Sequence, residues 1–183
     1  MKPRILNFGS INIDHVYRVD HFVQAGETLA SDSMSTVLGG KGANQSVAIA
    51  RAGGDVRHIG RLCEADQWVS TYLEASGVDI SLLETVAEPS GHAIIQLDSE
   101  GENSILLHGG ANQGFDKTSL ESAIAQYNPG DYLLLQNETN AIAHAFDLTI
   151  SQGLKVVLNP APMSDDILSL PLEKLDTLSL IHI

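Results

Sequence analysis

The sequence predicts an α/β fold built on a mostly parallel sheet with helices on both faces, and three observations lead to it. Short, almost wholly apolar segments such as 132–135 and 154–158 alternate with stretches whose apolar residues recur at helical spacing. Apolar strands separated by amphipathic helices are typical of parallel sheets that are covered on both faces. The 183 residues, of which 43% are hydrophobic and 18% charged, suffice for one globular domain with a substantial core.

The expected elements follow from apolar spacing and from the residues that end each segment. Glycines at 53–54, 77 and 153 follow three helical patterns, as the left-handed C-cap position favours glycine. Two extended runs flank a short polar link that contains Gly101, which predicts a β-hairpin. In chain order, the sequence predicts a strand at 4–8, a helix at 43–51, a strand at 56–60, a helix from about 66 to 76, the hairpin strands 93–98 and 103–107, a helix capped by Asp116, a strand at 132–135, a helix over about 140–151 and a strand at 154–158.

Composition and charge exclude several classes of function. A net charge of −13 argues against a surface for nucleic acid or anionic membranes. No run of consecutive apolar residues exceeds four, and residues 1–4 lead directly into the first strand, so neither a transmembrane helix nor a signal peptide is expected. The single cysteine, Cys63, cannot form an internal disulfide, which suits the cytosol. We therefore expect a cytoplasmic protein that binds neither nucleic acid nor a membrane.

Polar residues follow two predicted strands, at the sheet edge where open α/β folds bind ligands. Asn12 and Asp14 are two positions apart, so both can point the same way from an extended segment after the first strand. Their amide and carboxylate suit sugar hydroxyls, although residues 9–14 also have the composition of a plain turn. Glu138 follows the strand 132–135 and can bind a sugar hydroxyl or merely begin the next helix, where acids suit the helix dipole.

A glycine-rich loop at 39–42 opens a helix, and Lys41 adds a cation to it. The loop lacks the Gly-Lys-Ser/Thr sequence of a mononucleotide loop, and Gln45 stands where a dinucleotide loop needs its third glycine. With Asn44 on the first helical turn, the loop suits a neutral polyol at least as well as a phosphate. The alternative is a structural glycine turn.

Taken together, these segments resemble the ribokinase branch of the PfkB carbohydrate kinases. The resemblance spans about residues 4–178 and implies a ribokinase-like α/β fold with a small β lid formed by about 14–38 and 91–110. The matching segments occur in the family's order and are 9–14 (GSINID), 39–45 (GGKGANQ), 99–103 (SEGEN), 109–112 (GGAN) and 158–162 (LNPAP).

The resemblance also implies an activity, which is the phosphorylation of the 5-hydroxyl of D-ribose by ATP. Mg²⁺ and K⁺ are the expected ions, and two subunits are expected to form a homodimer through their lids. Other kinases of the family, acting on deoxyribose, fructose or a nucleoside, are alternatives, and so is a non-catalytic sugar-binding module. Matching positions assign sugar binding to Asn12, Ile13, Asp14, Gly40, Lys41, Gly42, Ala43, Asn44 and Glu138.

The ATP side of the family's site has no counterpart in this sequence. An Asn-x-x-Glu segment should follow residues 176–178, and a Gly-Ala-Gly-Asp anion hole with the catalytic aspartate should lie further on. We therefore expect residues 1–178 to be the N-terminal part of a kinase domain that holds mainly the sugar site, has no catalytic residue and is inactive alone. Residues 178–183 match one reading frame of a common sequencing adaptor, so 179–183 are expected to be a non-native tail. A genuine short C-terminus is the alternative.

Overall fold

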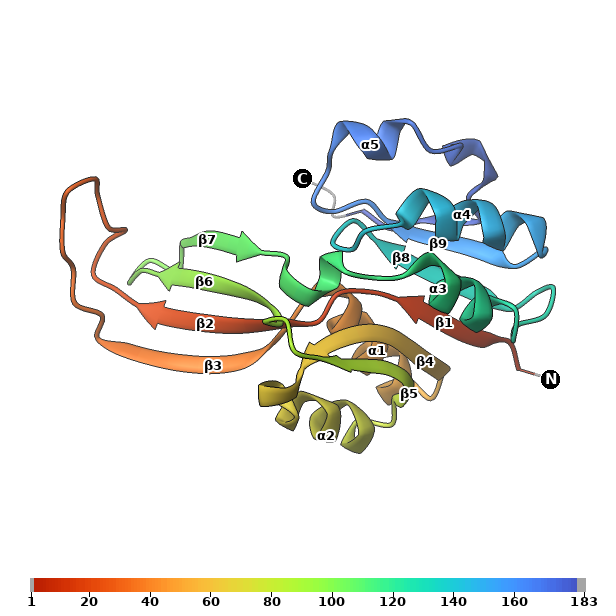
Figure 1. Cartoon of the computed structure of the whole chain (residues 1–183). Helices are drawn as coiled ribbons and strands as arrows, with labels where there is room; N and C mark the ends of the chain where they lie inside the picture. Colours follow the sequence, from red (N-terminus) through yellow and green to blue (C-terminus); the bar gives the residue numbers. More distant parts are fainter. Residues whose placement is uncertain (1, 181–183) are drawn as a thin grey trace.

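The computed structural model describes residues 2–180, which form a six-stranded parallel sheet and a separate four-stranded sheet (Figure 1). The large sheet has the order β10-β9-β8-β1-β4-β5 and the small one the order β3-β2-β6-β7. The large-sheet strands are β1 (Arg4–Phe8), β4 (Asp55–Cys63), β5 (Asp79–Val86), β8 (Tyr132–Gln136), β9 (Lys155–Asn159) and β10 (Thr177–Leu178). The small-sheet strands are β2 (Asn12–Arg18), β3 (Ser33–Gly39), β6 (Gly91–Leu97) and β7 (Asn103–His108).

Helices cover both faces of the large sheet, which confirms the predicted fold class. Side chains alternate between the two faces of β1, so Leu6 and Phe8 pack into a core with α3 and α4, whereas Ile5 packs toward α1 and α2. The helices are α1 (Lys41–Arg51), α2 (Trp68–Ala75), α3 (Lys117–Ile124), α4 (Ile142–Ser151) and α5 (Asp165–Leu168), with short 3-10 helices η1 (Glu64–Asp66), η2 (Gly110–Gln113) and η3 (Leu172–Lys174).

Most predicted elements are confirmed, with differences at their ends. Asp116 caps α3 as predicted, because its Oδ2 accepts hydrogen bonds from the backbone N–H groups of residues 118 and 119 at 3.1 and 3.2 Å. The helix predicted from about 140 begins at Ile142, because Ala141 adopts a left-handed φ of 62° that no helical residue can have. The strand predicted at 56–60 continues to Cys63 because it pairs with β5, which the sequence analysis missed along with α5.

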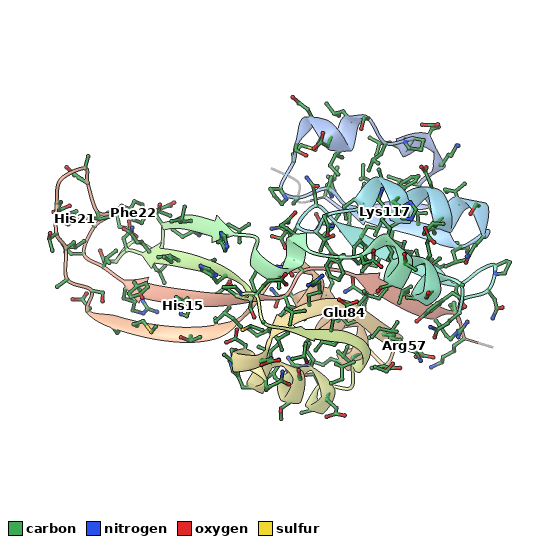
Figure 2. All side chains as sticks on the ribbon, in the orientation of Figure 1. His15, His21, Phe22, Arg57, Glu84 and Lys117 are labelled. Carbon is green, nitrogen blue, oxygen red and sulfur yellow. The ribbon has the colours of Figure 1, made fainter. Side chains whose placement is uncertain are left out.

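The small sheet projects from the large one, and the predicted hairpin forms half of it (Figure 1). β6 and β7 pair antiparallel, with Ile95 opposite Ile105, while β2 pairs with both β3 and β6. The loop between β2 and β3 lies at the far end of this sheet, where Figure 2 labels His21 and Phe22. Within residues 2–180, none of the helices combines the length and the apolar character that a membrane crossing requires.

Candidate functional site

A cavity of about 200 Å³ lies where the small sheet meets the carboxyl edge of the large one. Asn12 reaches it from the segment after β1, and Glu138 from the segment after β8, so the cavity lies at the edge where open α/β sheets bind ligands. We call this cavity the sugar pocket, after the sugar site that the family resemblance implies. Its walls are formed by Asn12, Asp14, Gly40, Lys41, Asn44, Ala93, Ile95, Ile105, Leu107 and Glu138.

Six of the nine predicted site residues therefore line one cavity, and three lie behind it. Ile13 and Ala43 are buried in the apolar core that α1 and α2 share with the sheet. Gly42 packs so closely on residues 9 and 10 that a Cβ would lie 2.5 Å from the backbone nitrogen of Ser10. These three residues shape the pocket from outside by holding α1 against the turn after β1.

Strand β2 turns the carboxylate of Asp14 toward the pocket. A side chain at Gly39, on the neighbouring strand, would overlap this carboxylate, so glycine leaves the room that Asp14 needs. Burial raises the pKa of the Asp14 carboxyl above its ordinary value of 3.8, and the nearby charge of Glu138 raises it further, against the opposing charges of His15 and Lys41. The pocket thus holds a half-buried carboxylate that favours a hydrogen-bond donor as its neighbour.

Glu138 is held by three hydrogen bonds from the two segments opposite it. Its Oε2 accepts from Ser10 Oγ at 2.5 Å and from the Lys41 backbone N–H at 2.9 Å, while its Oε1 lies 2.6 Å from Lys41 Nζ. The side chain is only 5% exposed. Since a carboxylate offers about four lone-pair sites, roughly one remains on Oε1 for a ligand. Ser10, which the sequence analysis passed over as a turn residue, is thus a direct partner of Glu138.

The α1 end of the pocket depends on a left-handed glycine. Gly40 has a φ of 88°, and a Cβ there would lie 2.9 Å from the backbone of Asn12. Lys41 follows at the first position of α1, which brings its backbone N–H and its ammonium onto the same carboxylate of Glu138. The start of α1 and the Lys41 ammonium therefore bind the carboxylate of Glu138, which belongs to the protein itself. For this reason the loop is not free to bind a phosphate as a mononucleotide-binding loop does.

A buried polar network that the sequence analysis did not predict lies beneath the pocket. Asn7 Nδ2 donates to Ser46 Oγ at 2.7 Å, and Ser46 Oγ is 2.8 Å from Nδ1 of His58. On its other side, Asn7 Oδ1 accepts from Gln136 Nε2 at 2.9 Å, and the same nitrogen donates to Gln45. An asparagine inside the apolar strand 4–8 was the one sequence signal for this network.

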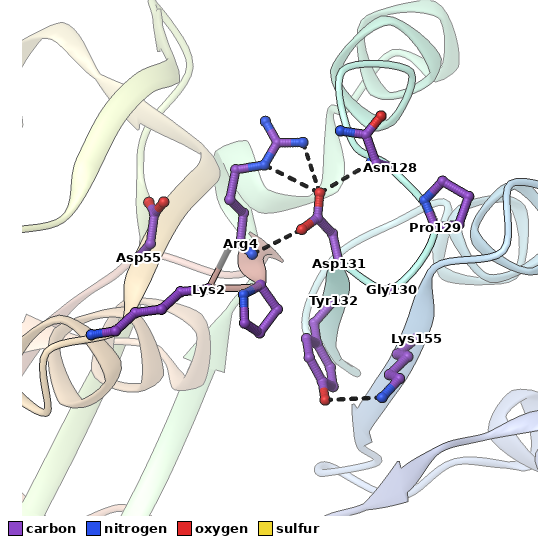
Figure 3. A pocket seen from close by; sticks show the side chains of 10 residues that line it. Lys2, Arg4, Asp55, Asn128, Pro129, Gly130, Asp131, Tyr132 and Lys155 are labelled. Carbon is purple, nitrogen blue, oxygen red and sulfur yellow. Dashed lines mark hydrogen bonds and ion pairs between the residues drawn. The ribbon is translucent and has the colours of Figure 1, made fainter.

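A larger cavity, of about 700 Å³, lies at the opposite edge of the sheet (Figure 3). One ion pair, between Arg4 and Asp131, lies in its wall. Asp131 accepts from the backbone N–H of Arg4 at 2.9 Å and from its guanidinium at 2.7 and 3.1 Å, and Lys155 Nζ lies 3.3 Å from the hydroxyl of Tyr132. These bonds join the amino ends of three strands, so we interpret this cavity as structural. In residues 2–180, no three His, Cys, Asp or Glu side chains are grouped to hold a metal ion.

Comparison with known proteins bears on this geometry. A model of the pfkB family of carbohydrate kinases matches residues 2–179. The chain belongs to this family. It is 40% identical over 179 residues to the ribokinase of Haemophilus influenzae, and this match covers 93% of the chain and 58% of that protein. The chain thus spans less than two thirds of the length of this relative.

Solved structures of the family have the same fold. The crystal structure of ribokinase from Cryptococcus neoformans var. grubii in complex with ADP matches with a TM-score of 0.87 at 37% identity, covering 97% of this chain and 56% of that one. The structure of Arabidopsis thaliana ribokinase complexed with ribose and ATP matches with a TM-score of 0.76 at 27% identity, covering 97% of this chain and 60% of that one. The ribokinase-like fold expected from the sequence is confirmed over the residues compared.

Proposed function

We propose that the protein phosphorylates D-ribose at its 5-hydroxyl with ATP, yielding ribose 5-phosphate, and that this chain contributes mainly the sugar-binding half of the site. The observation that carries this proposal is the sugar pocket, where Asn12, Asp14, Lys41 and Glu138 converge from separate segments in a chain of the pfkB family. Similarity to ribokinases supports ribose as the sugar.

The size and chemistry of the pocket support a small neutral polyol. A volume of about 200 Å³ corresponds to roughly seven water molecules at about 30 Å³ each, which is the scale of one monosaccharide. Amide, ammonium and carboxylate groups on one side can donate to and accept from hydroxyls, while Ala93, Ile95 and Leu107 form an apolar wall on the other. Apolar contact on one face with hydrogen bonds on the other is a common way to bind a sugar ring.

In the proposed reaction, these residues bind and orient the sugar. Asp14 accepts hydrogen bonds from hydroxyls, Asn12 and Lys41 donate to sugar oxygens, and the apolar wall excludes water. Phosphoryl transfer depends on holding the attacking oxygen in line with the phosphate. How precisely these hydrogen bonds orient the sugar should therefore affect kcat as well as the affinity for the sugar.

We propose ATP, Mg²⁺ and K⁺ as the cofactors, in keeping with the resemblance. ATP would supply the phosphoryl group. The carboxylates of the sugar pocket do not fit either ion, because Glu138 already binds Lys41 and Ser10 and Asp14 has no second acid free to join it.

We further propose that residues 1–178 belong to one kinase domain in which the small sheet acts as a lid, and that two lids meet in a homodimer. Three apolar side chains of this sheet support the second part, since Val37 is 44%, Ile105 56% and Leu107 44% exposed. A second copy that covers this face would also close the sugar pocket, which Ile105 and Leu107 line. We propose the cytoplasm as the location.

A coupled assay of ADP formation by the full-length kinase to which we propose this chain belongs, over a panel of ribose, deoxyribose, fructose and a nucleoside, tests the proposed activity. We expect ribose to give the highest kcat/KM, and Asp14→Asn to reduce it at least tenfold because a charge-assisted hydrogen bond is lost. Asp147→Asn, at an exposed position of α4, is the matched control. Preference for another sugar would replace ribose in the proposal, and sugar binding without ADP formation would favour a non-catalytic module.

A further inference from the structure

Asn112, in η2, forms hydrogen bonds with the backbone of Ile11, just before the predicted sugar-binding residues Asn12 and Asp14. Its Oδ1 accepts from the Ile11 N–H at 3.0 Å, and its Nδ2 donates to the Ile11 carbonyl at 3.0 Å. The second Nδ2 hydrogen goes to Oδ1 of Asn12 at 2.8 Å. Asn112 is 1% exposed, so all of its donors are used inside the protein. It lies 100 residues away from Asn12 in the sequence.

The third of these bonds determines which end of the Asn12 amide is free. Because Oδ1 of Asn12 accepts from Asn112, its Nδ2 group is the end left to face a ligand. Asn12 lines both the sugar pocket and an adjoining cavity of about 270 Å³, and no residue within 2–180 accepts a hydrogen bond from its Nδ2. Asn12 therefore presents donors, next to the acceptor carboxylate of Asp14.

The space for this pair of amides is built into the neighbouring strand. Gly91 on β6 lies opposite Asn12 on β2. A Cβ at position 91 would overlap both Nδ2 of Asn112 and Oδ1 of Asn12. Any other residue there would push the two side chains apart, so three separate segments combine to hold one amide in one orientation.

We propose that Asn112 is a positioning residue that fixes Asn12 as a hydrogen-bond donor, and thereby makes the pocket select a sugar hydroxyl that accepts from Asn12 while it donates to Asp14. This inference rests on the proposed function. A hydroxyl has one hydrogen, so it can satisfy one donor and one acceptor, but it cannot donate to two acceptors at once. Reversing the Asn12 amide would leave one of the two pocket groups unpaired.

Asn112→Asp provides the test, because the carboxylate keeps the size of the amide but has no hydrogens for Asn12. The Asn12 amide should then turn its Nδ2 toward residue 112 and its oxygen toward the ligand. We expect the affinity for D-ribose to fall about tenfold. Across 1-deoxy-, 2-deoxy- and 3-deoxyribose, the wild-type protein should discriminate strongly against one analogue, and this discrimination should fall to near unity in the variant.

A second variant and a matched control separate positioning from simple damage. Asn12→Asp keeps the acceptor for Asn112 and removes the donor, so it should lose the same discrimination even if Asn112→Asp fails to fold. Asn140 grips the backbone of Phe115 in the same way, with its Oδ1 at 3.0 Å and its Nδ2 at 2.9 Å. Asn140→Asp should lower stability without changing the ratio of affinities. If Asn112→Asp and Asn140→Asp each lowered the affinity for every sugar by the same factor, the proposal would be overturned.

Hydrogen exchange of the side-chain amides, measured by NMR without sugar, decides the question independently of the proposed function. In the wild-type protein the Nδ2 hydrogens of Asn112 should exchange slowly and those of Asn12 rapidly, and Asn112→Asp should slow the exchange of Asn12. Protected Asn12 hydrogens in the wild type would overturn the proposal. A wild-type protein that binds no pentose would instead refute the proposed function, while the exchange result still stands for or against Asn112.

Discussion

Acidification should destabilise the fold through one histidine, His58. Its imidazole is fully buried, Nδ1 lies 2.8 Å from Ser46 Oγ, and Nε2 has no hydrogen-bond partner within the described residues. Burial lowers the pKa of His58 from 6.5 to about 4. The nearby backbone of Gly9 favours the protonated ring and raises the pKa, but this offsets only part of the effect of burial. The folded protein therefore keeps His58 neutral at pH values where the unfolded chain protonates it.

The size of the effect follows from the two pKa values. Between pH 6.5 and 4 the unfolded state binds more protons, so the free energy of unfolding is highest above pH 6.5 and decreases as the pH falls. At about 1.4 kcal/mol per pKa unit, the whole shift is worth about 3 kcal/mol. This is a large part of the roughly 5–15 kcal/mol that stabilises a typical domain.

Urea unfolding of the wild type and of His58→Gln, at several pH values between 7.5 and 4.5, measures how much His58 contributes to the pH dependence of the free energy of unfolding. Glutamine is neutral throughout and can still form a hydrogen bond with Ser46. Carboxylates titrate in both proteins, so their contribution cancels when the two are compared. We expect the wild type to lose about 2–3 kcal/mol more than the variant over this range. Parallel pH profiles for the two proteins would refute the reasoning.

Three further predictions concern the pocket and the small sheet. Because burial raises the pKa of Asp14, ribose affinity should begin to fall at a higher pH than an ordinary aspartate would cause, and calorimetric titrations of Asp14→Asn should show no such fall. Gly39→Ala should weaken ribose binding at least tenfold, since its Cβ overlaps the Asp14 carboxylate, and a variant that binds normally would contradict this packing. Ile105→Glu should convert the proposed homodimer to monomers in sedimentation experiments, and an unchanged sedimentation coefficient would exclude this face as the interface.

Local signals in the sequence predict which residues come together at the sheet edge. Asn12 and Asp14 follow a short apolar strand, and Glu138 follows another, so the rule that ligands bind at the carboxyl edge placed them together. The hairpin was equally local. Strand β5 was missed because its apolar residues are interrupted by polar ones such as Glu84, and only its pairing with β4 makes it a strand.

The partners of the site residues could not be predicted in the same way. Asn112 belongs to a short segment that the resemblance identified only as the exit from the lid, and its role depends on a contact across 100 residues. The network of Asn7, Ser46 and His58 likewise joins three elements. Hydrogen bonds between distant segments depend on how the sheets and helices pack, which no local pattern specifies.

Glu138 shows how such partners change the interpretation of a residue. The family resemblance predicts that it binds the sugar, yet three of its hydrogen bonds go to Ser10 and Lys41. Its main effect should therefore be to hold the Lys41 ammonium at the pocket. If so, Glu138→Gln and Lys41→Met should each weaken ribose binding about tenfold or more, and the double variant should bind little worse than either single one. Additive losses would mean that Glu138 and Lys41 bind the sugar independently. Non-additive losses would mean that the carboxylate acts through the lysine, and that the pair forms one functional unit of the pocket.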